Sequence, residues 1–551
     1  MRAAVTEIVR SALDKAVREG ALKAGRLPDV IIERPKKEGF GDFSTNAAML
    51  LAPLEKRPPR DIAAVIAAGI AEDPLVEKCE VAGPGFINIF LKNSFHLSML
   101  GSILKKAERF GTTDAGRGRR VQIEFVSANP TGPLHIGHGR GAAVGDSLAN
   151  ILKAAGFDVT REYYINDAGR QVYTLGESVR LRIKEIETGE PVEFPADFYK
   201  GEYVKEIARD YLDKYNAPGR AGATPTFQEF ACSAMLDRIE KDLKDFRIEF
   251  DVWYSEKSLE EKGLVNDTIE ELRKRGCIYE SEGALWFKST EFGDDKDRVL
   301  IKADGERTYF ASDIAYHREK VKKGFTTLVN VWGADHHGYE GRIRALLKAL
   351  GHDDSALKII FIQLVALMRN GAPVPMGKRE GEFVTLRQVM DEVGVDACRF
   401  FFLMRRSDAH LDFDLELAKS QAPENPVYYV QYCHARIRSI ISFAAEKGVK
   451  IPDEFDPRLL ERLDQKEETG IIKHLGSFEE VVERAALNME PHRVAFYLTE
   501  LAGLFHPYYN RNRVVTDDAE LTIARLLLCK AVGTVAANGL RLLGVTAPEK
   551  M

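Results

Sequence analysis

The sequence is poor in the features that mark secreted proteins and membrane-spanning proteins. Its six cysteines are scattered, with no Cys-x-x-Cys pair, so we expect neither a zinc ribbon nor a disulfide framework. No segment reaches the roughly 20 apolar residues that a membrane-spanning helix needs. These absences predict reduced, mostly buried thiols and no insertion into a membrane.

Net positive charge is also lacking, because the formal net charge is −6. A protein that binds nucleic acid without regard to sequence usually has a basic face, which this composition argues against. A large RNA recognised by its shape and by a few bases stays compatible with this charge. Residues 1–10 form an amphipathic, acid-containing helix pattern rather than a signal or transit peptide, so we expect a cytoplasmic protein.

What is present is a long chain with three kinds of pattern. At 551 residues it exceeds what one hydrophobic core can hold. Residues 1–110 mix helix and strand patterns, and strands then alternate with longer helices, which favours a parallel α/β sheet over 111–420. The polar region about 190–290 interrupts that alternation and is predicted to be an inserted subdomain. Residues 421–551 show only helical periodicity, which predicts a helical bundle.

The most informative stretch, residues 127–141, follows a predicted strand and opens a predicted helix. Residues 121–126 are apolar and β-branched, and apolar residues then recur at helical spacing until Gly156. His135 and His138 lie on the first turn of that helix. A helix start presents unpaired backbone amides and a positive dipole end, so we expect the amides and imidazoles here to face ATP phosphates.

Taken alone, two histidines three residues apart are also compatible with a pair of zinc ligands, or with ordinary hydrogen-bonded residues near a helix cap. The wider context is more specific. Residues 124–138, from Glu124 to His138, resemble the first ATP-binding motif of class I aminoacyl-tRNA synthetases, in the form found in the arginyl-tRNA synthetase family. The resemblance implies that His135 and His138 are catalytic and that Pro133 and Gly137 contact ATP.

This resemblance covers essentially the whole chain and implies both a fold and an activity. The implied fold is multidomain α/β, with a Rossmann-like catalytic domain carrying an insertion, an N-terminal α+β domain and a C-terminal all-α bundle. The implied reaction activates L-arginine with ATP to arginyl-adenylate, then transfers arginine to the 2′-hydroxyl of the terminal adenosine of its tRNA. ATP is then a substrate, accompanied by Mg²⁺, and we expect a monomer.

Tyr309 and Asp313 lie four residues apart, hence on one face of a predicted helix. Without context, a core tyrosine and a surface aspartate would explain them. The run 304–316 resembles the helix that supplies the amino-acid pocket of the same family. Carboxylates bind a planar guanidinium in bidentate fashion. The resemblance assigns arginine binding to seven residues: Glu124, Ser127, Asn129, His138, Tyr309, Asp313 and His337.

Gly333, Asp335, His336 and His337 follow an apolar strand and precede a helical run. An Asp-His-His sequence also occurs in metal-dependent phosphoesterases, which would use these side chains as metal ligands. In the synthetases the equivalent loop instead borders the amino acid and the adenosine ribose. We favour that reading, with Gly333, Asp335 and His336 at ATP and with no metal site built by the protein.

Residues 374–384 form a glycine-rich stretch that could be a basic surface turn. They resemble the second class I motif, Lys-Met-Ser-Lys-Arg, incompletely: Pro375 replaces the first Lys and Gly377 replaces Ser. Lys378, the lysine that neutralises pyrophosphate charge, is present, and Met376 is expected at ATP. A non-catalytic tRNA-binding relative would be expected to lack some of these catalytic residues.

Both ends of the chain resemble the tRNA-binding parts of the same family. At the N-terminal end, Phe86 and Asn88 are implied to meet a base of the tRNA D-loop. At the C-terminal end, Tyr508 and the final residue, Met551, are implied to contact tRNA, since unpaired bases stack on exposed aromatics. For each aromatic residue there, a place in a buried core is the alternative.

Overall fold

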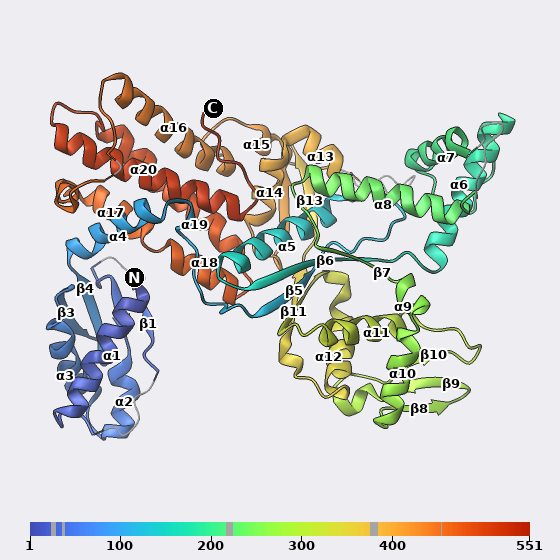
Figure 1. Cartoon of the computed structure of the whole chain (residues 1–551), viewed down its shortest axis with the longest axis horizontal. Coiled ribbons are helices and arrows are strands. Elements are labelled where there is room, and N and C mark those ends of the chain that lie inside the picture. Colours follow the sequence, from blue (N-terminus) through green and yellow to red (C-terminus); the bar gives the residue numbers. More distant parts are fainter. Residues whose placement is uncertain (24–28, 36–38, 216–223, 375–383, 453) are drawn as a thin grey trace.

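A computed structural model describes residues 1–23, 29–35, 39–215, 224–374, 384–452 and 454–551. The N-terminal region is an antiparallel sheet of order β1-β2-β4-β3 covered by helices (Figure 1). It has its own hydrophobic core, which matches the predicted α+β region. Its elements are α1 (Arg2–Arg18), β1 (Ile32–Glu33), β2 (Phe43–Thr45), α2 (Ala47–Glu55), α3 (Pro59–Ala71), β3 (Val76–Ala82), β4 (Phe86–Leu91) and α4 (Asn93–Lys106).

The centre of the molecule is a parallel sheet of order β12-β11-β5-β6-β7. The predicted parallel α/β architecture is therefore confirmed. The carboxyl ends of parallel strands meet at one edge, where such sheets bind ligands. The strands and their flanking helices are β5 (Arg120–Glu124), α5 (Ile136–Ala154), β6 (Asp158–Ile165), β7 (Val252–Ser255), α11 (Tyr309–Lys322), β11 (Thr327–Gly333), α12 (Glu340–Ala349) and β12 (Leu357–Ile362).

The inserted region differs from the prediction of one subdomain at about 190–290. Strand β7 lies inside that range, yet it is the edge strand of the central sheet. It divides the region into a helical part before it and a part with a small antiparallel sheet after it, on the right of Figure 1. Strand β7 has only four residues, all of them half-buried, so it shows no alternation of buried and exposed positions. The two parts comprise α6 (Arg170–Thr188), α7 (Glu202–Tyr215) and α8 (Phe227–Asp245), then α9 (Lys257–Glu261), α10 (Leu264–Lys274), β8 (Ile278–Ser281), β9 (Ala284–Phe287) and β10 (Arg298–Ile301).

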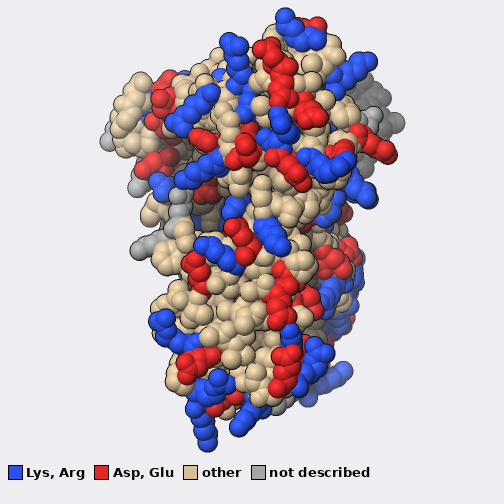
Figure 2. All heavy atoms as spheres, turned by 90° about the vertical axis from the view of Figure 1, so that its left-hand side faces the viewer, with Lys and Arg blue, Asp and Glu red and all other residues tan. Residues whose placement is uncertain are grey.

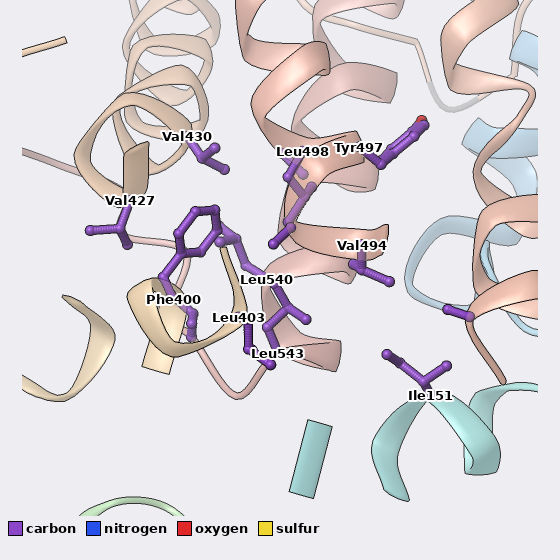
Figure 3. Packing of buried hydrophobic residues seen from close by; sticks show 14 of the residues in the cluster. Ile151, Phe400, Leu403, Val427, Val430, Val494, Tyr497, Leu498, Leu540 and Leu543 are labelled. Carbon is purple, nitrogen blue, oxygen red and sulfur yellow. The ribbon is translucent and has the colours of Figure 1, made fainter. Parts of the chain in front are cut away.

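The remainder of the chain is mostly helical, as the periodicity predicted, and it shares one hydrophobic cluster with the central domain. Figure 3 shows this shared packing, with Ile151 of α5 and Phe400 of α14 near Leu498 and Leu540 of the terminal helices. The connecting elements are β13 (Val365–Arg369), β14 (Ala372–Pro373), α13 (Leu386–Val393), α14 (Val395–Leu403), β15 (Leu411–Asp414) and α15 (Leu415–Lys419). The bundle comprises α16 (Pro426–Glu446), α17 (Lys466–Leu475), α18 (Phe478–Leu487), α19 (His492–Arg511) and α20 (Ala519–Leu542).

Helix α20 alone among the described helices is long and apolar enough, by length and composition, to cross a membrane. It is not an unbroken run of about 20 apolar residues, because Arg525, Lys530 and Arg541 lie within it. Its most apolar window is 78% buried inside the protein, where it packs against α16 and α19. Burial in a core explains this composition equally well, because a helix with apolar residues on every face occurs in a protein interior.

The residues after α20 are bonded to α5. Ser147 Oγ donates to the Leu543 carbonyl (3.3 Å), and the Arg399 guanidinium donates to the same carbonyl (2.9 Å) and to Asp146 (2.5 Å). Gly544 has φ +66, and a Cβ there would collide with the Arg399 guanidinium. The segment after α20 is therefore joined to α5 directly by Ser147 and indirectly by Arg399 of α14, which forms a buried ion pair with Asp146 of α5.

The N-terminal region meets the bundle through α4 and through ion pairs. Leu97, Leu100 and Ile103 of α4 belong to the hydrophobic cluster that includes the bundle. Lys106 pairs with Glu479 (2.6 Å), and Lys473 pairs with Asp42 (2.6 Å), whose carboxylate is buried. The more exposed Lys106–Glu479 pair contributes about 0–1 kcal/mol. Figure 2 faces this side of the molecule and shows Lys and Arg interleaved with Asp and Glu rather than a continuous basic surface.

Candidate active site

His135 and His138 cap the start of α5 reciprocally; we call them the imidazole pair. His135 Nδ1 accepts from the amides of Gly137 (3.1 Å) and His138 (3.3 Å), and His138 Nδ1 accepts from the His135 amide (3.3 Å). Their rings stack with centroids 3.6 Å apart. Each Nδ1 acts as an acceptor, so each ring proton resides on Nε2.

Burial lowers the pKa of both imidazoles, that of His138 to about 3 with His135 as the second cause. The imidazole pair is thus neutral at pH 7 and acts as a pair of Nε2–H donors rather than as cations. The capping bonds also correct one prediction from the sequence. The amides of Gly137 and His138 are already engaged by the His135 ring, so these two amides do not face a phosphate.

A cavity of about 330 Å³ lies at the edge of the central sheet where β5, β6, β7 and β11 end. Five of its lining residues were predicted to bind arginine: Glu124, Ser127, Asn129, Tyr309 and Asp313. Gly333 and His336, predicted at ATP, line it too. The structure therefore brings together residues from distant parts of the chain at one site.

Three carboxylates line this cavity, those of Glu124, Glu256 and Asp313; we call it the acidic cavity. Burial, together with the neighbouring Glu256 and Glu124, raises the pKa of Asp313 to about 7. Burial also raises the pKa of Glu256, against a hydrogen bond from Ser312. Carboxylates with raised pKa values in one cavity are disposed to bind a cationic ligand, which would favour their ionised forms.

The acidic cavity is also lined by neutral polar groups, among them Asn129, Asn166 and Gln171. Asn129 Nδ2 donates to Gln171 Oε1 (2.7 Å), and Asn166 Nδ2 donates to Asn129 Oδ1 (2.6 Å). Just before them the backbone is strained, because Val126 and Ser127 have φ +69 and +40. Such strain in non-glycine residues tends to occur at functional sites.

Two predicted arginine ligands have partners within the protein. Ser127 Oγ donates to Glu124 Oε1 (3.0 Å) and accepts from the Tyr164 amide (3.1 Å), so its hydroxyl is used in shaping the loop. Glu124 Oε2 accepts from the buried Lys320 ammonium (2.5 Å). By contrast, the buried Tyr164 hydroxyl, which belongs to a lining residue, has no hydrogen-bond partner among the described residues. A buried hydroxyl without a partner indicates a polar ligand.

The loop from Gly333 to Tyr339 separates into two sides. His336 lines the acidic cavity and pairs with Asp335 (3.1 Å). His337 is not among the lining residues, and its ring stacks on Phe361 with centroids 3.7 Å apart. Within the described part of the chain, no group of three or more His, Cys, Asp or Glu side chains is arranged to hold a metal ion. Nothing in this geometry favours the metal-dependent phosphoesterase alternative.

Met376 and Lys378 lie outside the described residues, and so do Pro375 and Gly377. The described chain resumes beside the imidazole pair. Thr385 pairs with His135 as an isolated β-bridge, and the Leu386 amide donates to the Leu134 carbonyl (2.7 Å). Pro133 immediately precedes this short pairing.

The four residues predicted to contact tRNA have very different exposures. Phe86, at the start of β4, is 37% exposed and Met551 is 54% exposed, whereas Asn88 is buried. Tyr508 is fully buried, and its hydroxyl donates to Glu468 Oε1 (2.9 Å). The prediction that Tyr508 contacts tRNA is therefore corrected: this side chain belongs to the core of the bundle and cannot stack on a base.

Sequence reasoning missed several residues of the acidic cavity. Glu256 directly follows β7, Asn166 directly follows β6, and Tyr164 and Trp332 lie near the ends of β6 and β11. One available signal was their position, since polar residues just after parallel strands gather at the ligand edge. That signal depended on recognising β7 as part of the central sheet.

Comparison with known proteins identifies three matching families along the chain. The "Arginyl tRNA synthetase N terminal domain" matches residues 3–91. The "tRNA synthetases class I (R), catalytic domain" matches residues 99–406, more than half of the chain. The "DALR anticodon binding domain" matches residues 430–551.

Curated relatives match over nearly the full length. An arginine–tRNA ligase of Citrifermentans bemidjiense is 52% identical over 539 residues, covering 97% of each chain. One of Desulfosudis oleivorans is 51% identical over 557 residues, covering 100% of each chain. Among solved structures, a putative arginyl-tRNA synthetase from Campylobacter jejuni is 36% identical with a TM-score of 0.76, covering 84% of this chain and all of that one. That of Thermus thermophilus, 23% identical with a TM-score of 0.76 over 100% of both chains, has the same fold.

Proposed function

The chain belongs to the arginyl-tRNA synthetase family, and from that premise we propose how its residues divide the reaction. The reaction is the ATP-dependent ligation of arginine to tRNA. The arginine carboxylate attacks the α-phosphorus of ATP, giving arginyl-adenylate and pyrophosphate. The 2′-hydroxyl of the terminal adenosine of tRNA then attacks the adenylate carbonyl and releases AMP.

The acidic cavity is the proposed arginine site, and its three carboxylates are the observation that carries this assignment. Asp313 and Glu256 pair with the guanidinium, whose planar fork suits carboxylate oxygens. Tyr309 closes the cavity from the first turn of α11, and Asn129 takes the amino end. Glu124 and Ser127 also line the site, but they mainly hold its shape, because both are hydrogen-bonded to other groups of the protein.

The imidazole pair and Lys378 form the proposed phosphate site. His135 and His138 donate hydrogen bonds from Nε2 to the oxygens that gain charge in the transition state, and Lys378 supplies the positive charge. Pro133, Gly137, Gly333, Asp335, His336 and Met376 are the other proposed ATP contacts. For His138 and His337, contact with arginine remains part of the proposal, although neither lines the cavity.

Mg²⁺ is proposed to arrive with the ATP triphosphate. Asp335 acts electrostatically on His135, but among the described residues no group of three candidate metal ligands occurs. When bound, the ion would offset phosphate charge. Each step above depends on the protein's own donors and charges.

For tRNA we propose that region 1–110 contacts the D-loop through Phe86 and Asn88. Region 421–551 contacts the anticodon, with Met551 at its exposed end. Residues 111–420 form the catalytic domain between them. We further propose a cytoplasmic location, which suits cysteines that are scattered without a Cys-x-x-Cys pair, and we propose that the protein is a monomer.

The test is ATP–pyrophosphate exchange and aminoacylation with each of the twenty amino acids. We expect arginine alone to support both reactions, with exchange that requires cognate tRNA. A Lys378→Ala variant should lose turnover far more than arginine affinity. Exchange with another amino acid, or turnover unchanged by Lys378→Ala, would overturn the corresponding assignment.

A further inference from the structure

Lys320 of α11 is fully buried behind the wall of the acidic cavity and is not among its lining residues. Its ammonium donates to Glu124 Oε2 (2.5 Å) and to Asn330 Oδ1 (3.0 Å), and lies 4.3 Å from the centroid of the Tyr316 ring. An ammonium has three N–H donors. Two are used by oxygens, and the third can face the aromatic ring as a cation–π contact.

These partners belong to the cavity or lead back to it. Glu124 and Tyr316 line the cavity directly. Asn330 Nδ2 donates to His317 Nε2 (2.9 Å), and His317 Nδ1 donates to the Asp313 carbonyl (2.9 Å). Burial lowers the pKa of His317 to about 3, so the ring is neutral and can donate from Nδ1 while accepting at Nε2.

A continuous path of hydrogen bonds therefore runs through the cavity wall, from Ser127 through Glu124, Lys320, Asn330 and His317 to the backbone of Asp313. Ser127, Glu124 and His317 line the cavity, whereas Lys320 and Asn330 are fully buried and do not. It joins the loop after β5 to the middle of α11 by way of β11. The first end of this path supports the wall near the proposed amino end of arginine, and the second supports the carboxylate proposed for its guanidinium. Because the path is buried, neither end can shift without disturbing the other.

Charge gives Lys320 a second effect. Three carboxylates line the cavity, and Lys320 neutralises that of Glu124 directly. The groups that act electrostatically on Asp313 are Glu256 and Glu124, which raise its pKa, and Arg342 and Lys320, which lower it. Removing the ammonium leaves Glu124 uncompensated, so Asp313 becomes harder to ionise.

We propose that Lys320 is a positioning residue for amino-acid selection, which fixes the separation of the two ends of the acidic cavity and so sets the length of the guanidinium-bearing side chain it accepts. This proposal rests on the proposed arginine site. Lys320 itself does not touch the substrate; it acts through Glu124, Tyr316 and the path to Asp313.

The test compares Lys320→Met with Lys322→Met in the full-length enzyme. Lys322, two residues further along α11, is 50% exposed in its side chain and has a looser partner, Glu319 (3.7 Å), so it is a matched control. We measure pyrophosphate exchange with arginine and with homoarginine, which is one methylene longer. For Lys320→Met we expect the arginine KM to rise about 30-fold with a smaller change in kcat, and the preference for arginine over homoarginine to fall about tenfold.

The dependence of kcat/KM on pH provides a second test, because a loss of folded enzyme lowers the rate without shifting the acid limb. In Lys320→Met the acid limb of kcat/KM for arginine should shift to higher pH, and in Lys322→Met it should stay in place. A folded Lys320→Met enzyme with the wild-type arginine KM, analogue preference and acid limb would overturn the proposal.

Lys320→Met could fail to fold, because it leaves a buried carboxylate unpaired. The double variant Lys320→Met/Glu124→Gln removes both charges and still interrupts the path. We expect it to fold and to discriminate poorly between arginine and homoarginine; wild-type discrimination would contradict the inference. If the wild-type enzyme itself shows no arginine-dependent exchange, the proposed function fails, which is a separate result.

Discussion

The acidic cavity and the imidazole pair, the two parts of the active centre, have opposite electrostatic character. The acidic cavity concentrates formal charge, with three carboxylates and a buried ammonium behind one of them. The imidazole pair, a few residues along the chain from Glu124, carries no charge at neutral pH, because burial depresses both pKa values. One end is built to bind a cation already present in the substrate. The other holds neutral donors for charge that develops only during the reaction.

This difference separates binding from turnover. Favourable interactions with a fixed cation stabilise the ground state and the transition state alike, which affects KM. Donors aimed at developing charge act mainly in the transition state, which affects kcat. Substitutions at the two ends should therefore have different kinetic signatures, and three experiments can test whether they do.

The largest effect is expected from Asp313→Asn. It removes a buried carboxylate from the guanidinium, and we expect kcat/KM for arginine in pyrophosphate exchange to fall about 1,000-fold, mainly through KM. Asp304→Asn, on the exposed turn before α11, is the control and should behave as wild type. If Asp313→Asn binds arginine nearly as well as the wild type, Asp313 does not bind the guanidinium.

A smaller effect, on kcat, is expected from His138→Asn. The asparagine oxygen can replace Nδ1 as acceptor for the His135 amide, but no donor remains at the position of Nε2. We expect kcat to fall about 100-fold and the arginine KM to change much less in steady-state exchange. His352→Asn, a change at an exposed histidine beyond α12, should alter neither constant. A rise in arginine KM that matches the fall in kcat would erase the distinction between the two ends.

The smallest effect is expected from pH alone. Asp313 has a pKa of about 7 in the empty enzyme, and its ionised form is the one that binds arginine. Between pH 8 and pH 6, kcat/KM for arginine should therefore fall about tenfold, and Asp313→Asn should lack this acid limb. A limb that persists in Asp313→Asn would assign the titration to another group.

The same ionisation has a consequence for stability. The folded-state pKa of Asp313 lies above its ordinary value, so its contribution to stability is present at low pH and is lost as pH rises through about 7. Arginine offsets that loss. Its effect on the unfolding temperature, measured by thermal denaturation, should be greater at pH 8 than at pH 6.

Sequence reasoning predicted the position of the imidazole pair fully but the acidic cavity only in part. The contiguous run from Glu124 to His138 predicted β5, α5 and the histidines because all its information is local. Glu256 was missed because β7 is short and half-buried, so its place in the sheet depends on pairing with β6. Lys320 reads as an ordinary surface lysine in the sequence, and only tertiary packing reveals its burial.

Two residues of the C-terminal region show that sequence alone also does not predict burial there. Tyr508 and Met551 both matched the family's C-terminal pattern, yet Tyr508 is buried against Glu468 and Met551 is exposed. A helical tyrosine suits a core as well as a surface, and its neighbours on other helices decide between them.

The bonds between the segment after α20 and α5 have a consequence for folding. Ser147 and Arg399 donate to the carbonyl of Leu543, and Asn150 donates to that of Leu542 (3.3 Å). The partners of Ser147 and Asn150 lie 396 and 392 residues further along the sequence, and contacts of such long range are entropically costly to form. The helix that begins with the two histidines therefore completes its native bonds only when the segment after α20 has docked on it.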